Sequence, residues 1–227
     1  VFHTGCRVLG DAYIRNTALR EGRHVYPRAL FPQLTADLRL YWAGQPVAKL
    51  WQRARIEAAG LRFPLGVHLA EDAYFFFSYL NVAHCVVFSC VEHYVYVSRP
   101  GSLTHQERPF GVTWTYYERF RAPSPFSQWV ERYATSAEVR REYLAFTASV
   151  LHRALTQART PADLRRPTGA DWDFFDACFR PTSFRSAMDV RMLRRFRRRP
   201  CMLLPYLAVG RGLRAAHILC RRLFGRW

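Results

Sequence analysis

Two adjacent carboxylates, Glu71 and Asp72, stand just before the aromatic run 74–77, and this block most constrains how the chain can fold. Acidic side chains in a first turn complement the helix dipole, so the block predicts a helix that opens at Glu71. The following stretches 86–88 and 94–97 are rich in β-branched and aromatic residues and predict strands. Together these signals favour an α/β arrangement.

The segment before this block mixes strand and helix signals. Residues 1–9 are β-rich and lead through a Gly-Asp turn toward a second expected strand at 12–15, which predicts a β-hairpin. Apolar residues at helical spacing predict a helix over 34–42. A shorter helix is predicted over 53–59, with Gly60 as its C-cap.

The second half of the chain has a helical pattern. A long amphipathic helix is predicted from Ser136 to about Arg159, where a Thr-Pro pair follows. Further helices are predicted over 171–179, 188–199 and 204–224. We therefore expect an α/β domain over residues 1–108 and a helical region over residues 109–227.

The charge of the chain points toward an anionic partner. The formal net charge is +17 in 227 residues, which suits nucleic acid, a lipid headgroup surface or a nucleotide sugar. The excess lies mainly in the C-terminal segment 186–227, which holds 11 arginines and one acid, Asp189. A nucleic-acid interface would interleave basic and aromatic residues in one module, whereas here the charge stands apart from the aromatic segment, so we expect no nucleic-acid partner.

The six cysteines form no CxxC pair, which favours reduced thiols and a cytoplasmic location. His84, Cys85, Cys90 and His93 cluster in sequence, but their segment reads as strand and zinc sites usually need closer ligand pairs, so no metal site is predicted here. No signal peptide or apolar stretch of spanning length is visible. The chain begins with Val1, and we expect it to be a fragment or a processed product.

Four short blocks stand in order between Ala48 and Ser102. They read Ala48-Lys49-Leu50-Trp51 with Arg53, Gly60-Leu61-Arg62-Phe63-Pro64, Glu71-Asp72-Ala73-Tyr74-Phe75, and Tyr94-Val95-Tyr96-Val97-Ser98-Arg99-Pro100-Gly101-Ser102. This series resembles the NKL(Y/F)-R, G-x-x-F-P, ED-x-x-F and Y-x-Y-R-x-x-GS pattern of family 2 glycosyltransferases. The resemblance covers about 47–104, and Ala48 departs from it where asparagine is usual.

The resemblance implies a partial GT-A-like fold, a mixed sheet with flanking helices, in which 1–108 is the acceptor-side part. It also implies a nucleotide-sugar donor, a glycan or lipid-linked acceptor, and a divalent metal, Mg or Mn, in the complete enzyme. The DxD motif that would hold the metal does not stand upstream in this chain, so the donor half is expected to be missing. Asp171 and Asp173 spell DxD on a predicted helix, which we interpret as coincidence.

The resemblance maps the catalytic aspartate of an inverting transferase onto Asp72, the expected general base. Glu71 is a helix cap, an orienter of the acceptor or a competitor for the base role. Lys49 and Arg99 are candidates for substrate contact, with a surface salt bridge as the alternative for each. Ser102 is a candidate hydrogen-bond donor or a turn residue, and Trp51 a sugar-stacking ring or a core residue.

From Tyr206 onward, apolar residues at helical spacing stand beside arginines, a pattern typical of an interfacial helix. The expected apolar face holds Tyr206, Val209, Leu213, Ala216, Cys220 and Leu223. We therefore expect a peripheral location on the inner face of the cell membrane, with a solvated basic helix packed on the core as the alternative. A further alternative for the whole chain is an inactive remnant that acts as a membrane-surface or interaction module.

Overall fold

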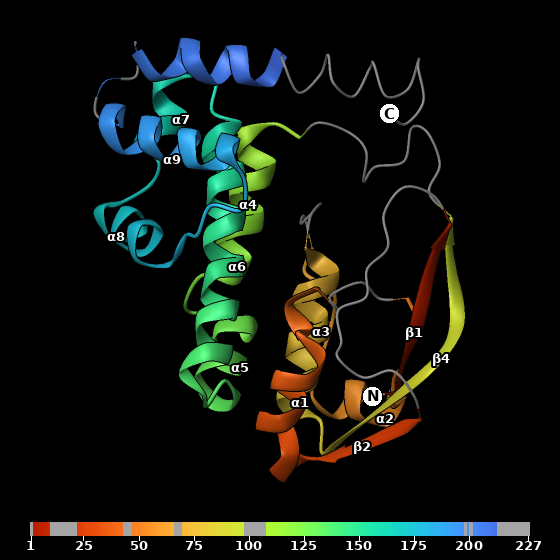
Figure 1. Cartoon of the computed structure of the whole chain (residues 1–227). Coiled ribbons are helices and arrows are strands. Elements are labelled where there is room, and N and C mark those ends of the chain that lie inside the picture. Colours follow the sequence, from red (N-terminus) through yellow and green to blue (C-terminus); the bar gives the residue numbers. More distant parts are fainter. Residues whose placement is uncertain are drawn as a thin grey trace. The chain divides into compact units, whose positions relative to one another are not determined.

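The structure, a computed structural model, describes residues 2–9, 22–42, 47–65, 70–97, 108–197, 199 and 202–212. The chain forms two compact units (Figure 1). Unit 1 comprises Val1–Glu107 and Glu118–Tyr143, and unit 2 comprises Arg108–Tyr117 and Leu144–Trp227. Unit 1 combines a sheet with helices, whereas the described part of unit 2 is helical, so the chain is an α/β protein with a helical region.

Unit 1 contains a four-stranded mixed sheet. Its strands are β1 (Phe2–Leu9), β2 (Arg23–Pro27), β3 (Lys49–Leu50) and β4 (Cys85–Val97), in the order β2-β4-β1-β3. The two central strands, β1 and β4, pair in parallel, whereas both edge strands pair antiparallel. The β1–β4 register shifts at Gly5, because Thr4 pairs with Ser89 and Gly5 with Glu92. Such a bulge bends a strand locally.

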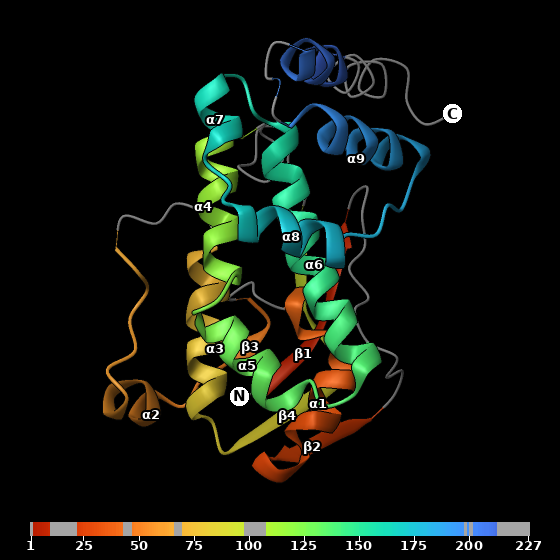
Figure 2. The ribbon, with the colours of Figure 1, turned by 90° about the vertical axis from the view of Figure 1, so that its left-hand side faces the viewer.

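Helices α1 (Phe31–Leu38) and α3 (Glu71–Val82) lie on one side of this sheet, as the two views agree (Figures 1 and 2). The short helix α2 (Arg53–Ala58) follows β3, and α5 (Pro125–Tyr133) packs on α3. The amide of Asn81 at the end of α3 donates a 2.8 Å hydrogen bond to the Pro125 carbonyl at the start of α5. This bond fixes the two helix ends against each other.

Aromatic rings fill the core between these helices. Phe77 of α3 contacts Phe126 edge-on at a centroid distance of 4.9 Å, and Trp129 contacts Phe31 at 5.2 Å. The Tyr143 hydroxyl donates to the Thr35 carbonyl at 3.1 Å and accepts from the Leu40 amide at 3.0 Å. An aromatic pair contributes about 0.5–1.5 kcal/mol beyond its buried area. Burial of these aromatic rings therefore fixes the position of α3, the helix that carries the two carboxylates.

Unit 2 is built from helices with local caps. It holds most of α4 (Phe110–Phe120) and α6 (Ala137–Thr156), together with α7 (Pro161–Arg165), α8 (Gly169–Cys178), α9 (Phe184–Phe196) and a helix over 202–212. A capping box opens each of α7, α8 and α9, at Thr160, Thr168 and Ser183. A cap of this kind contributes about 1 kcal/mol, so each boundary is set by its own sequence.

Several sequence predictions are confirmed, and one helix ends earlier than predicted. Helices α2, α3, α6 and α8 form close to their predicted ranges. The helix predicted over 34–42 instead ends at Leu38, because Arg39 takes a left-handed conformation with φ 43° and a 3-10 turn follows. The strand predictions at 86–88 and 94–97 are confirmed, and both stretches belong to one continuous strand, β4. The second hairpin strand at 12–15 and the helix beyond 212 lie outside the described residues.

Candidate functional site

The two carboxylates occupy the first turn of α3. Ala70 precedes them in a left-handed conformation, with φ 63° and ψ 17°, and offers no side-chain cap. Asp72 compensates in part, because its Oδ1 accepts a 2.7 Å hydrogen bond from the Ala73 amide, one of the free amides of the first turn. Glu71 and Asp72 are both half-buried. The helix prediction at Glu71 is confirmed, and the acids sit at its positive end.

Burial raises the pKa of Asp72 above its ordinary value. The Ala73 amide opposes this shift, the neighbouring Glu71 charge adds to it, and the Lys49 ammonium lowers the pKa again. The net direction is upward, so desolvation outweighs the hydrogen bond and the cation. A carboxylate with a raised pKa is a stronger base than a free aspartate, which suits proton abstraction.

Lys49 reaches this helix from the edge strand β3. Its Nζ lies 5.1 Å from the centroid of the Phe76 ring and donates a 3.3 Å hydrogen bond to the Val47 carbonyl. Ala48, just before it, is left-handed with φ 57°. Asparagine tolerates this conformation better than alanine does.

Trp51 and Phe63 hold their two sequence blocks against α3. The Trp51 ring meets Phe75 at 5.4 Å and Tyr79 at 4.9 Å, both edge-on. The Phe63 ring stacks on Phe75 at 4.4 Å with an interplanar angle of 6°. The blocks at 48–53, 60–64 and 71–75 thus each contribute an aromatic ring to one cluster on α3. Trp51 is half-buried within this cluster, and its role as a sugar-stacking ring stays a prediction.

One further candidate, Arg119 of α4, has no sequence signal. Its guanidinium carbon lies 5.6 Å from the centroid of the Tyr74 ring, two residues after Asp72. Within the described structure its Nε is buried without a hydrogen-bond partner. Arg119 lies outside the four blocks in sequence, so only its contact with Tyr74 within unit 1 reveals it. The contact places a cation against Tyr74 in α3.

Arg99 and Ser102 lie outside the described residues, so their predicted substrate contacts stay predictions. Among the described residues, no three His, Cys, Asp or Glu side chains come together as a metal-ligand set. Asp171 of the Asp-Trp-Asp sequence is buried and caps α8, accepting from the Thr168 amide at 2.8 Å and from the Tyr117 hydroxyl at 2.7 Å. This carboxylate is therefore used in a structural cap.

Comparisons with protein-family models, with curated proteins and with solved structures give no significant match for this chain.

Proposed function

We propose that the chain is the acceptor-side part of a family 2-like glycosyltransferase and that Asp72 is its general base. One observation carries the proposal: three of the blocks that resemble the family pattern converge on α3, around a half-buried aspartate of raised pKa. The central β1–β4 pair, with α3 leading into β4, is compatible with a partial GT-A-like sheet.

The proposed reaction is an inverting sugar transfer. The Asp72 carboxylate accepts the proton of an acceptor hydroxyl while the hydroxyl oxygen attacks the anomeric carbon of a nucleotide sugar. A new glycosidic bond forms as the bond from that carbon to the diphosphate breaks. The nucleoside diphosphate leaves with the electron pair, and the proton stays on Asp72 until solvent removes it.

Lys49 and Arg119 are cations that contact aromatic rings of α3, Lys49 at Phe76 and Arg119 at Tyr74. Cations near a developing negative charge stabilise the transition state, so either residue is suited to an anionic part of the acceptor or to the leaving diphosphate. Glu71 directly precedes the proposed base in sequence and raises the pKa of Asp72, which gives Glu71 a tuning effect as well as the cap and orienter roles.

The divalent metal that the resemblance implies does not fit the described residues. Glu71 and Asp72 form a pair without a third ligand, and Asp171 is held in its cap. We therefore assign no metal ligand and no step of the reaction to a metal in this part of the chain.

The test is the rate of sugar transfer by the full-length gene product, with uridine-, guanosine- and thymidine-diphosphate sugars and with oligosaccharide and lipid-linked acceptors. Release of nucleoside diphosphate is the readout. Asp72→Asn should lower kcat by about 100-fold to 10,000-fold, the usual contribution of a general base. Asp163→Asn is the matched control, because Asp163 is a carboxylate in the capping box of α7.

Near-normal turnover of the Asp72→Asn variant would contradict the assignment of the base. If no donor and acceptor pair supports turnover by the unmodified protein, the enzyme proposal fails, and an inactive interaction module becomes the better description. Glu71→Gln separates the roles left open for that residue. If Glu71 is a cap, the substitution changes stability alone. If Glu71 orients the acceptor, the substitution raises KM, and if it is a competing base, the substitution lowers kcat.

A further inference from the structure

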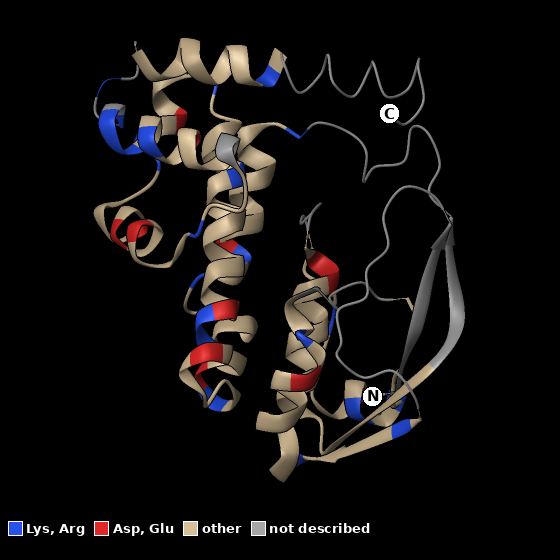
Figure 3. Cartoon of the chain, in the orientation of Figure 1, with Lys and Arg blue, Asp and Glu red and all other residues tan. Residues whose placement is uncertain are grey.

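The helix over 202–212 in unit 2 exposes a face without charge. Its exposed residues are Met202, Pro205, Ala208, Val209 and Gly212, which recur at helical spacing along one stripe. Met202 is 48% exposed and Val209 is 64% exposed. A surface helix normally turns its apolar residues inward and its charges outward. Figure 3 shows the same segment almost free of charged residues over its length.

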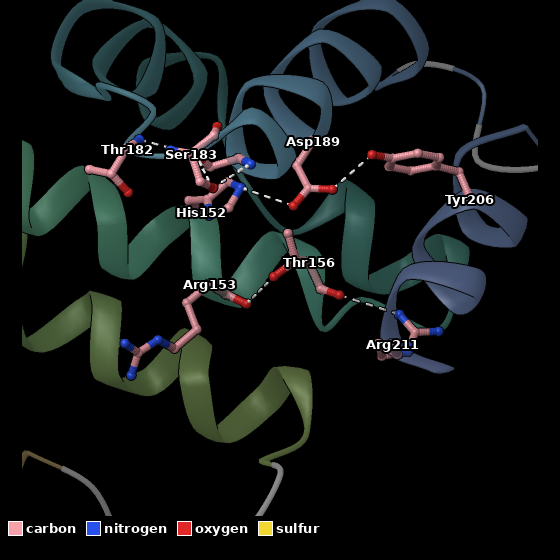
Figure 4. Close-up of polar contacts among 9 residues, drawn as sticks. His152, Arg153, Thr156, Thr182, Ser183, Asp189, Tyr206 and Arg211 are labelled. Atoms are coloured by element: carbon pink, nitrogen blue, oxygen red, sulfur yellow. Dashed lines mark hydrogen bonds and ion pairs between the residues drawn. The ribbon is translucent and has the colours of Figure 1, made fainter. Parts of the chain in front are cut away.

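Polar contacts hold the other side of this helix inward (Figure 4). The Tyr206 hydroxyl donates a 2.9 Å hydrogen bond to Asp189 of α9, whose other carboxylate oxygen lies 3.6 Å from Nε2 of His152. The Arg211 guanidinium donates to the Ala158 carbonyl at 2.7 Å, beyond the end of α6. Leu203 and Leu207 are buried on the same side. These hydrogen bonds fix which side of the helix is exposed. The exposed stripe differs from the predicted apolar face, because that face included Tyr206.

The neighbouring helix α9 carries exposed arginines. Arg191, Arg194 and Arg195 are exposed, and they line a hollow of about 510 Å³ together with Pro181, Ala187 and Val190. Arg194 also pairs with Asp176, at 2.6 Å between its Nε and Oδ1. The single acid of segment 186–227, Asp189, is only 3% exposed, so it does not offset these cations at the surface. Helix α9 thus exposes several arginines, and the Tyr206–Asp189 hydrogen bond joins it to the helix that carries the uncharged stripe.

We propose that the stripe over 202–212 and the arginines of α9 dock this protein on an anionic lipid bilayer. Apolar side chains enter the headgroup boundary while each arginine near an anionic leaflet contributes about 1 kcal/mol. A second copy of the chain fits less well, because a two-fold contact would place the same arginines against each other. No helix in the described ranges is long and apolar enough to cross a bilayer, so the contact is interfacial. This inference is independent of the chemistry assigned to Asp72.

The test is flotation of the protein with phosphatidylcholine vesicles and with vesicles of phosphatidylcholine and phosphatidylglycerol. We expect binding to the anionic vesicles that weakens as salt is raised, and little binding to the neutral ones. The double variant Met202→Glu, Val209→Glu should bind anionic vesicles at least about 10-fold more weakly, because it places charge on the stripe alone. Arg191→Gln with Arg195→Gln should weaken binding by about 10- to 30-fold.

Leu65→Glu is the matched control, since Leu65 of unit 1 is a 98% exposed apolar residue outside the proposed surface. Circular dichroism checks that each variant keeps its helix content. Equal binding to both vesicle types, or unchanged binding of the Met202→Glu, Val209→Glu variant, would overturn the proposal. So would a change of oligomeric state in that variant without a change in vesicle binding, because the stripe would then contact a second copy.

Discussion

At the scale of single residues, unfavourable backbone conformations and a raised carboxyl pKa occur close to Glu71 and Asp72. Two alanines in left-handed conformations, Ala48 and Ala70, directly precede Lys49 and Glu71. Such a conformation costs about 1–2 kcal/mol in a residue with a Cβ atom. Burial also raises the pKa of Asp72, so ionisation of this carboxyl group is less favourable in the folded protein than in the unfolded chain. Strain of this kind is often found at functional sites, where it is balanced by the surrounding structure.

The pKa of Asp72 gives a prediction about stability and pH. A carboxyl group whose pKa is raised on folding stabilises the folded state below its unfolded pKa, and this stabilisation is lost as pH rises through the folded pKa. At neutral pH the charge is therefore destabilising, and Asp72→Asn should raise the free energy of unfolding. Urea unfolding from pH 3 to pH 7 should show the gain growing with pH. A loss of about 0.3–1 kcal/mol at pH 7 would instead identify Asp72 as a dipole-complementing cap.

At the scale of elements, a hydrogen bond from the Tyr206 hydroxyl links the helix over 202–212 to Asp189 of α9. Tyr206→Phe removes the hydrogen bond to the buried carboxylate of Asp189 and leaves one of its oxygens without that donor. We expect the free energy of unfolding to fall by about 1–3 kcal/mol. Tyr133→Phe is the control, because the Tyr133 hydroxyl makes no hydrogen bond within the described residues. Equal effects of the two variants in urea unfolding would refute the anchoring role of Tyr206.

Elements with local signals could be predicted from the sequence. The acids at 71–72, the glycine at position 60 and the helical spacing after Ser136 each act within a few residues, and α3, α2 and α6 follow from them. Arg39 could not be foreseen as a helix end, because a left-handed arginine has no sequence signal. Strand β4 is continuous because β1 and β2 pair along it, and such pairing depends on distant residues.

Only part of the candidate site could be predicted from the sequence. The resemblance placed Lys49, Trp51 and Asp72 in one site, and the structure brings these three residues to α3. Arg119 could not be predicted, because its contact with Tyr74 joins residues that are distant in sequence. The inward turn of Tyr206 also escaped prediction, since a tyrosine at helical spacing fits an apolar face or a buried hydrogen bond equally well.

At the scale of the whole molecule, two helices are shared between the units. Both α4 and α6 begin in one unit and end in the other as continuous helices. Phe77 in unit 1 and Phe175 in unit 2 are each fully buried. Because a shared helix cannot unfold in one unit without losing its bonds in the other, we expect the chain to unfold in a single transition.

Phe77→Ala and Phe175→Ala should each lower the free energy of unfolding by about 3–5 kcal/mol, the usual effect of removing a buried phenylalanine ring. Differential scanning calorimetry should show the same single peak moving to lower temperature in both variants. Two peaks, of which each variant moves only one, would show that the units unfold separately.

The parallel pairing of β1 with β4 also constrains how the chain reaches its native state. Phe2 pairs with Val87 and Leu9 with Val97. The centre of the sheet can therefore form only after the long segment between β1 and β4 has brought the two strands together. Closing so long a loop carries an entropy cost before any contact compensates for it, and chains dominated by distant contacts fold slowly. During synthesis β1 therefore leaves the ribosome well before β4 has been synthesised. Until then β1 is an unpaired strand that chaperones can protect from aggregation.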